Sequence, residues 1–269
     1  MTRTSARTHS AARKAPTAPP LAPTSKAPST AAPSSTATRA STTAPAFTVV
    51  SYNLWKNHAV HELDALAAST EADLLCLQEV YTGSMPDQIG DLRRIASTAN
   101  NRLGLAIYGR QDRFDVRETR SYSLGRSMHD RIMSPTPERL VAARLVDLAT
   151  DRHFVIASFH AAPLSARNSV RRAQIRAAHL GLEALGAGLP AMMIGDFNYP
   201  WFSGRLRRTL ARTGHTLARA VEGTYRGYGV VRGRFDLVTA TRFDLGAVRV
   251  LPQAASDHMP IIVRVEPRV

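Results

Sequence analysis

The sequence is poor in cysteine, in lysine and in long apolar runs. Cys76 is the one cysteine among 269 residues, which excludes an internal disulfide and a zinc site built from several thiolates. No apolar run approaches the roughly 18 residues that a membrane-spanning helix needs, so we expect no integral membrane segment. Three of the 35 basic residues are lysines, and the others are arginines.

Acidic residues are also scarce. The chain holds 21 Asp and Glu against 35 Lys and Arg, which gives a formal net charge of +14. A charge of this sign favours anionic partners such as nucleic acids, phosphoesters or acidic lipid headgroups, and it carries no information about the fold. Hydrophobic residues make up 44% of the chain, close to a globular average, so most of it can bury a core.

The first 45 residues differ from the rest in composition. Ala, Ser, Thr and Pro fill 36 of these positions, acids are absent, and six residues are basic. Such a segment cannot bury enough apolar area to offset its chain entropy, so we expect a disordered basic tail over 1–45 and a folded domain over 46–269. The tail lacks the apolar stretch of about 7–15 residues of a secretory signal, which leaves the compartment unknown and cytoplasmic by default.

Short apolar runs in the domain predict β-strands, with helices between some of them. The runs that predict strands cover 47–52, 73–78, 103–108, 140–146, 153–159, 191–195, 235–240 and 260–265. Helices are predicted over 58–69, 86–99, 165–187 and 204–213, and Ser165 can cap the third of them. Strands and helices mix without strict alternation, which favours one α/β domain.

Polar residues stand at the ends of these apolar runs. In chain order they are Asn53, Gln78-Glu79, His160, Gly195-Asp196-Phe197-Asn198, Asp236 and Ser256-Asp257-His258. Side chains at strand ends can meet at one rim of a sheet, where carboxylates, amides and imidazoles would suit metal-assisted attack on phosphorus. Each residue alone also fits an ordinary turn or surface position, so the ordered series is the signal.

This series resembles the endonuclease/exonuclease/phosphatase superfamily, which has the DNase I-like fold. The resemblance covers 47–265, and its most specific segments are Gly195–Asn198 and Ser256–His258. It implies an α/β (α+β) architecture: a four-layer sandwich with two packed mixed β-sheets and the site at one rim. It also implies phosphoester cleavage that depends on Mg²⁺ or Mn²⁺.

The resemblance assigns the metal and the attacking water to five residues. Glu79 corresponds to the main carboxylate ligand of the metal, and Asn53 and Asp257 complete or support its shell. Asp196 orients or deprotonates the attacking water, and Asn198 holds water or a phosphate oxygen.

The resemblance also assigns the two histidines and a carboxylate. His258 would contact the phosphate, with Asp236 fixing its tautomer, and His160 would lie on the leaving-group side. The segment around His160 is most similar to the DNase I branch, in which this histidine has a carboxylate partner. The candidates for that partner are Asp112, Asp115 and Glu118.

Arginines gather in the second half of the domain. The window 165–234 holds twelve of them against three acids. Arg forks suit phosphate groups, so we expect Arg167, Arg171 and Arg172 to contact substrate together with Tyr199. A solvated basic face explains the same composition equally well.

Three functions compete at this point. The first is a monomeric nuclease that cleaves DNA or RNA phosphodiesters by in-line attack of an activated water. The alternative is a phosphodiesterase or phosphatase that uses the same site on small-molecule or lipid-headgroup phosphoesters. The third is a non-catalytic binder, against which the complete residue set argues. DNA against RNA and endo- against exonucleolytic cleavage stay open, because loops rather than the fold select the substrate.

Overall fold

The computed structural model describes residues 46–99, 103–125, 138–227 and 232–268. The basic tail predicted over 1–45 lies outside these residues. In the part of the chain that is described, no helix is long and apolar enough to cross a membrane.

The first sheet is built around β1 (Phe47–Asn53), which pairs parallel with β2 (Leu74–Val80) and antiparallel with β16 (Ile261–Pro267). The strand order is β14-β16-β1-β2-β5-β4-β3, and β15 also pairs with β16. The remaining strands of this sheet are β3 (Gln88–Ile89), β4 (Leu92–Ser97), β5 (Gly104–Arg110), β14 (Phe243–Leu245) and β15 (Arg249–Val250).

The second sheet has the order β10-β13-β9-β8-β7-β6. Its only parallel pair is β8 (Arg152–His160) with β9 (Ala191–Asp196), among the residues described. The other strands are β6 (Phe114–Ser123), β7 (Glu138–Asp147), β10 (Thr216–Ala218) and β13 (Asp236–Thr241). A short hairpin of β11 (Tyr225–Arg226) and β12 (Arg232–Gly233) stands apart from both sheets.

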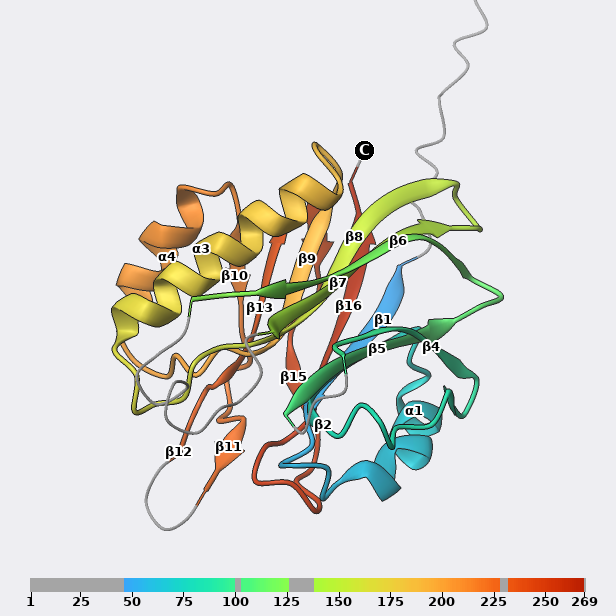
Figure 1. Ribbon diagram of the computed structural model, residues 1–269, viewed down its shortest axis with the longest axis horizontal. Coiled ribbons are helices and arrows are strands. Elements are labelled where there is room, and N and C mark those ends of the chain that lie inside the picture. Colours follow the sequence, from blue (N-terminus) through green and yellow to red (C-terminus); the bar gives the residue numbers. More distant parts are fainter. Residues whose placement is uncertain (1–45, 100–102, 126–137, 228–231, 269) are drawn as a thin grey trace, which may run out of the picture. The chain divides into compact units, whose positions relative to one another are not determined.

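The two sheets pack face to face, and helices cover their outer faces (Figure 1). A cluster of four phenylalanine rings marks the core between the sheets: Phe47, Phe114, Phe154 and Phe243. A 3₁₀ turn (Val60–Glu62) leads into α1 (Leu63–Thr70), which packs on the first sheet. The second sheet is covered by α3 (Asn168–Leu185) and α4 (Ser203–Ala211). The predicted four-layer sandwich is therefore confirmed.

One predicted helix is wrong. The segment 86–99 forms β3 and β4, with a turn at Gly90 in the left-handed region (φ +52°). Leu92 and Ala96 are both buried and lie four residues apart, which resembles a helical repeat. They face opposite sides of the sheet, because a bulge between Arg94 and Ala96 reverses the alternation.

The other differences from prediction concern an edge strand and a helix start. The edge strand β6 is exposed along most of its length and is rich in polar residues, so no apolar run marks it in the sequence. Helix α3 begins at Asn168 with Arg167 at its N-cap and no side-chain cap, so the predicted Ser165 cap does not form.

Candidate active site

The strand register brings the predicted polar residues to one rim of the sandwich. In the first sheet, β1 ends at Asn53 beside Gln78 of β2, one residue before Glu79. In the second sheet, Asp196 at the end of β9 is in register with His160 on one side and with Asp236 on the other. Because the sheets pack face to face, these strand ends converge, and atoms from both sheets come into contact.

Glu79 projects from a kink in β2. The strand has a bulge between Gln78 and Val80, and Glu79 lies in the left-handed region at φ +54°. The backbone N–H of Lys56 donates to Glu79 Oε2 at 3.1 Å, and that of Asn57 donates to the Glu79 carbonyl at 3.0 Å. Burial raises the pKa of Glu79, while the charge of His258 opposes this shift. The local backbone thus holds one carboxylate oxygen and leaves the other facing the rim.

Asp196 is held by amides on both sides. Its Oδ2 accepts hydrogen bonds from Asn53 Nδ2 at 3.2 Å and Asn198 Nδ2 at 3.1 Å, and its Oδ1 accepts the Asn198 backbone N–H at 2.8 Å. Burial raises the pKa of Asp196 to about 7, and the charge of His258 opposes the shift. The carboxylate is therefore fixed in orientation and tuned toward accepting a proton near neutral pH.

Gly195 makes this arrangement possible. Its φ is +146°, and a Cβ atom added there would lie 2.1 Å from the carbonyl oxygen of Phe159 on β8. A glycine is required at this position because the backbone of β9 approaches β8 too closely for any side chain.

His258 is paired with Asp236 and faces Asp196. Its Nδ1 lies 2.9 Å from Asp236 Oδ2, and its Nε2 lies 3.7 Å from Asp196 Oδ2. Burial alone would lower the pKa of His258, but the carboxylates of Asp236 and Asp196 outweigh it and raise the pKa to about 10. The ring is therefore a buried cation with its Nε2 toward the rim.

His160 has different surroundings from those predicted. Asp112, Asp115 and Glu118 all form ion pairs with arginines near the other end of the second sheet or along β6, so none of them supports this ring. None of these three candidates is therefore the carboxylate partner of His160. The nearest carboxylates to His160 Nε2 are Asp196 Oδ2 at 3.6 Å and Glu79 Oε1 at 3.7 Å.

An arginine also lies beside His160. Arg139 of β7 is buried next to it, and its Nη1 donates to the carbonyl of Ala161 at 3.4 Å. Burial lowers the pKa of His160 well below its ordinary value, and the charges of Arg139 and His258 act in the same direction. His160 is thus a neutral imidazole at neutral pH.

The structure gives a place at the site to residues for which the sequence suggested no role. Gln78, fully buried, donates to Ser158 Oγ at 2.9 Å and so bridges the two sheets beneath the rim. The ring of Tyr225 lies 4.8 Å from that of His258, edge to face. Nothing in the sequence marks Arg139 as a site residue, because a charged residue early in a strand is common. Gln78 stands out in the sequence only because it precedes Glu79.

Two of the predicted substrate contacts lie inside the molecule. Arg171 is buried, and its guanidinium donates to the carbonyl of Pro163 and to Asn168 Oδ1. Tyr199 is buried too, and its hydroxyl accepts a hydrogen bond from Arg172 at 2.9 Å. Both are structural in this arrangement, which corrects their expected place on the surface, whereas Arg167 is exposed and Arg172 is half-buried.

The donor set at the rim fits a hard divalent cation that keeps water ligands. The described residues contain no group of three or more His, Cys, Asp and Glu side chains arranged to hold a metal ion. Glu79 offers a carboxylate, and Asn53 offers an amide whose Oδ1 accepts the backbone N–H of Trp55 at 3.0 Å while its Nδ2 faces Asp196. The half-buried Asp257 follows Ser256, whose hydroxyl donates to the carbonyl of Asn53. Mg²⁺ is commonly bound by a few protein oxygen ligands and without thiolates.

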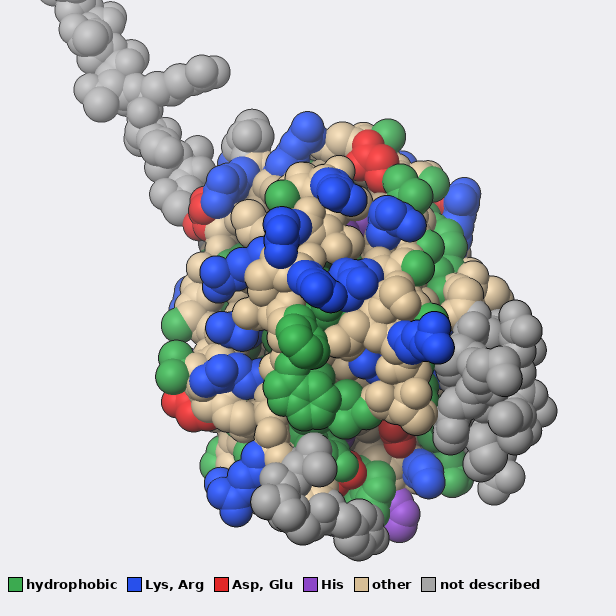
Figure 2. All heavy atoms as spheres, turned by 90° about the vertical axis from the view of Figure 1, so that its left-hand side faces the viewer, with side chains coloured by type: hydrophobic (Ala, Val, Ile, Leu, Met, Phe, Trp, Pro, Cys, Tyr) green, Lys and Arg blue, Asp and Glu red, His purple; other side chains and the backbone are tan. Residues whose placement is uncertain are grey.

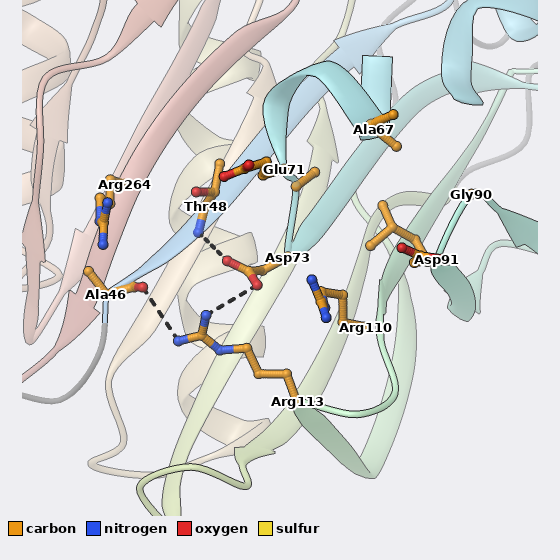
Figure 3. Close-up of a pocket in the computed structure, with 13 residues that line it drawn as sticks. Ala46, Thr48, Ala67, Glu71, Asp73, Gly90, Asp91, Arg110, Arg113 and Arg264 are labelled. Carbon is orange, nitrogen blue, oxygen red and sulfur yellow. Dashed lines mark hydrogen bonds and ion pairs between the residues drawn. The ribbon is translucent and has the colours of Figure 1, made fainter. Parts of the chain in front are cut away.

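A cavity lies away from the rim, at the opposite end of the first sheet, where β1 and β2 begin (Figure 3). It has a volume of about 580 Å³. Asp73, which lines the cavity, accepts the backbone N–H of Thr48 at 2.8 Å and pairs with Arg113 at 3.1 Å. Asp73 is thus held by a backbone amide and by an arginine, which is the arrangement of a structural carboxylate.

Comparison with known proteins agrees with the geometry. The model of the Endonuclease/Exonuclease/phosphatase family matches residues 50–258. No curated protein matches the chain in sequence.

Several solved structures share the fold at low sequence identity. A protein of this family from Bacteroides thetaiotaomicron aligns with a TM-score of 0.68 and 17% identity, over 84% of this chain and 99% of that one. A mannosyl-6-phosphatase from the same species aligns at 0.64 and 17%, over 81% and 99%. TDP2 of D. rerio, in complex with a single-strand DNA product, aligns at 0.64 and 14%, over 82% and 99%.

The family model spans most of the chain, and the residues that carry the resemblance meet at one rim of the expected sandwich. The chain therefore belongs to the endonuclease/exonuclease/phosphatase family of phosphoester hydrolases.

Proposed function

We propose that the chain is a divalent-metal-dependent nuclease that cleaves phosphodiester bonds of DNA or RNA by in-line attack of water. The observation that carries this proposal is the buried series Asp236–His258–Asp196, which holds a charged imidazole 3.7 Å from a carboxylate whose pKa is raised to about 7. A cation and a proton acceptor held side by side can stabilise a phosphoryl group and activate a water molecule.

The roles follow from these positions. Glu79 and Asn53, supported by Asp257, would hold Mg²⁺ or Mn²⁺, which supplies Lewis-acid stabilisation of the phosphoryl oxygens when bound. Asp196 accepts a proton from the attacking water as the water oxygen forms its bond to phosphorus. Asn198 orients that water. His258 donates from Nε2 to a phosphoryl oxygen, and Asp236 keeps the ring charged.

The leaving group departs on the side of His160. The bond from phosphorus to the leaving oxygen breaks as the bond to the water oxygen forms. His160 is neutral, so it stabilises the leaving oxygen by donating a hydrogen bond, and the adjacent charge of Arg139 favours negative charge there.

The alternative is a phosphodiesterase or phosphatase that acts on small-molecule or lipid-headgroup phosphoesters. This alternative is tested as well, because the roles proposed for the rim residues all concern the phosphoryl group. None of these roles requires a base or a sugar. The same residues would serve in both cases.

A metal-dependence assay over a panel of substrates tests the proposal. The purified full chain is chelated, and Mg²⁺, Mn²⁺, Ca²⁺ and Zn²⁺ are restored one at a time. The substrates are single-stranded DNA, plasmid DNA, RNA, bis(p-nitrophenyl) phosphate, inositol phosphates and sphingomyelin vesicles. We expect activity on a nucleic acid only with Mg²⁺ or Mn²⁺. Full activity of the chelated protein would contradict the metal dependence, and turnover confined to the small phosphoesters or vesicles would support the alternative.

A further inference from the structure

Two large aromatic side chains project into solvent beside the rim. Trp201 is 55% exposed and Phe202 is 65% exposed. They follow the Asp196–Asn198 segment after Tyr199 and Pro200. Five residues of chain span at most about 18 Å, so the Cα atom of Trp201 lies within that distance of the Cα atom of Asp196. The other large hydrophobic side chains that are exposed in the described residues are aliphatic: Val116, Leu148, Leu180 and Val221.

Phe202 adopts a costly backbone conformation. Its φ of 62° and ψ of 37° lie in the left-handed region, which a non-glycine residue occupies at a cost of about 1 kcal/mol or more. Its carbonyl accepts the backbone N–H of Arg205 at 2.9 Å, so Phe202 caps the start of α4. The Phe202 ring lies outside the core, so hydrophobic burial does not offset the free-energy cost of this backbone conformation.

Four exposed arginines flank the aromatic pair. Helix α4 buries Leu206 and Leu210 against the second sheet, which leaves Arg205 and Arg208 on its outer side. Arg226 and Arg232 are exposed on the β11–β12 hairpin. Within the described part of the chain, none of the four forms an ion pair.

The hairpin and the aromatic loop are adjacent. A Cβ atom added at Gly233 of β12 would lie 3.0 Å from Pro200 Cβ, one residue before Trp201. The hairpin also contacts the rim, because Tyr225 pairs with His258 and the Arg226 N–H donates to the carbonyl of Asp257 at 2.9 Å. Figure 2 shows this side of the molecule, where Lys and Arg side chains surround a hydrophobic patch.

We propose that this aromatic–arginine surface, formed by Trp201, Phe202, Arg205, Arg208, Arg226 and Arg232, binds single-stranded nucleic acid and leads it into the rim. The inference rests on the proposed function. Bases stack on the two rings, and backbone phosphates bind the guanidinium groups. We expect a single strand rather than a duplex to bind, because the bases of a duplex are stacked on one another and their faces are not available to the rings.

A membrane surface suits the same residues less well. Insertion into an anionic bilayer calls for a continuous apolar face with basic residues around it. Here the outer side of α4 carries arginines rather than aliphatic residues, and the apolar part is limited to two flat rings. Flat rings next to guanidinium groups match the alternation of bases and phosphates along a strand.

Binding is measured without turnover, with the full chain, EDTA and a fluorescently labelled 12-nucleotide oligonucleotide. We expect Trp201→Ala with Phe202→Ala to weaken anisotropy-detected binding roughly 10-fold or more, since each stacked base contributes measurably to affinity. Trp201→Phe with Phe202→Tyr keeps two rings and should restore most of the affinity. Leu148→Ala with Leu180→Ala, two exposed aliphatic residues elsewhere, is the matched control and should bind like the parent.

The arginines have their own matched pair of variants. Arg205→Ala with Arg208→Ala should weaken binding and flatten its dependence on salt, because fewer counterions are released. Arg264→Ala with Arg268→Ala removes two exposed arginines near the far end of the first sheet and should leave the salt slope closer to that of the parent. Intrinsic fluorescence adds a direct readout: the chain has two tryptophans, so quenching by the oligonucleotide that is lost in Trp201→Phe reports stacking on Trp201.

Catalysis separates this inference from the proposed function. With Mg²⁺, the double aromatic variant should raise KM for the oligonucleotide at nearly unchanged kcat and leave hydrolysis of bis(p-nitrophenyl) phosphate unaffected. If no substrate is cleaved, the proposed function fails, while the binding experiment in EDTA still decides the inference. The inference would be overturned if Trp201→Ala with Phe202→Ala and Arg205→Ala with Arg208→Ala both bound the oligonucleotide like the parent. It would also be overturned if these variants lost duplex binding and single-strand binding equally. Binding of phosphatidylglycerol vesicles, but not oligonucleotide, through Trp201 and Phe202 would overturn it in favour of a membrane.

Discussion

His258 and Asp236 form a buried hydrogen bond of 2.9 Å between Nδ1 and Oδ2. The two residues lie 22 positions apart in the chain and come together because β13 begins at the rim while the loop before β16 returns to it. The bond fixes which nitrogen of the ring faces the rim, and the carboxylate keeps the ring charged. Proton placement at the candidate site therefore depends on this pair.

The first prediction concerns that pair. His258→Ala should lower kcat by roughly 10²-fold or more, since it removes a charged donor at the phosphoryl group. Asp236→Asn should also lower kcat and should bring the pKa of His258 down, because the neutral amide no longer stabilises the imidazolium. Steady-state kinetics and NMR titration of the ring measure the two effects. A His258 pKa unchanged in Asp236→Asn would show that the pair does not set the charge.

The second prediction concerns metal binding by Glu79. Glu79→Gln replaces a charged oxygen donor by a neutral one, so the Mg²⁺ concentration for half-maximal activity should rise by about 10-fold or more. Isothermal titration calorimetry with Mn²⁺ gives the affinity independently of turnover. Glu222→Gln, an exposed carboxylate on the loop after β10, is the control. Equal metal affinity in Glu79→Gln and in the parent would place the cation elsewhere.

The third prediction concerns pH and stability through a buried histidine outside the site. His179 stacks on His215 with ring centroids 3.6 Å apart and contacts Thr213 and Thr239 through its two nitrogens. Burial, helped by His215, lowers the pKa of His179 to about 2. The folded state thus takes up this proton far less readily than the unfolded chain, whose histidine titrates near 6.5.

The sign follows from that difference. The stabilisation is present above pH 6.5 and is lost as the pH falls from about 6.5 toward 2, because the unfolded state alone gains the proton. Between pH 7 and pH 5 the free energy of unfolding should fall by roughly 2 kcal/mol more in the parent than in His179→Gln. Urea denaturation at the two pH values measures this. An identical pH dependence in both proteins would contradict the shifted pKa.

The fourth prediction concerns the backbone beneath Asp196. Gly195→Ala forces a Cβ atom to within 2.1 Å of the Phe159 carbonyl at a φ that side chains rarely adopt, so unfolding should become easier by roughly 3 kcal/mol or more. Gly204→Ala is the matched control, because nothing lies within 4 Å of the added atom in α4. We expect that variant to be neutral or slightly stabilised in thermal melts. Similar melting temperatures for the two variants would refute the steric account.

The sequence by itself was enough to locate the family and most of the rim. Asn53, Glu79, Asp196 and His258 each follow or precede an apolar run, and a strand end is the one place where a polar side chain can face solvent next to a buried segment. Their contacts bear out the expected convergence, while their catalytic roles stay predictions. Local patterns could reach this far because a run of alternating or continuous apolar residues encodes the strand itself.

Tertiary structure alone decided which groups surround those residues. Register between strands and packing between layers set the bulge that turns Glu79 toward the rim and the position of Arg139 beside His160. They also set the burial of Arg171 and Tyr199. Leu92 and Ala96 show the same limit, since one extra residue in β4 reversed the face of every residue after it. Short local patterns of apolar residues determine which segments form strands, whereas contacts between residues far apart in the chain determine the partners of each side chain.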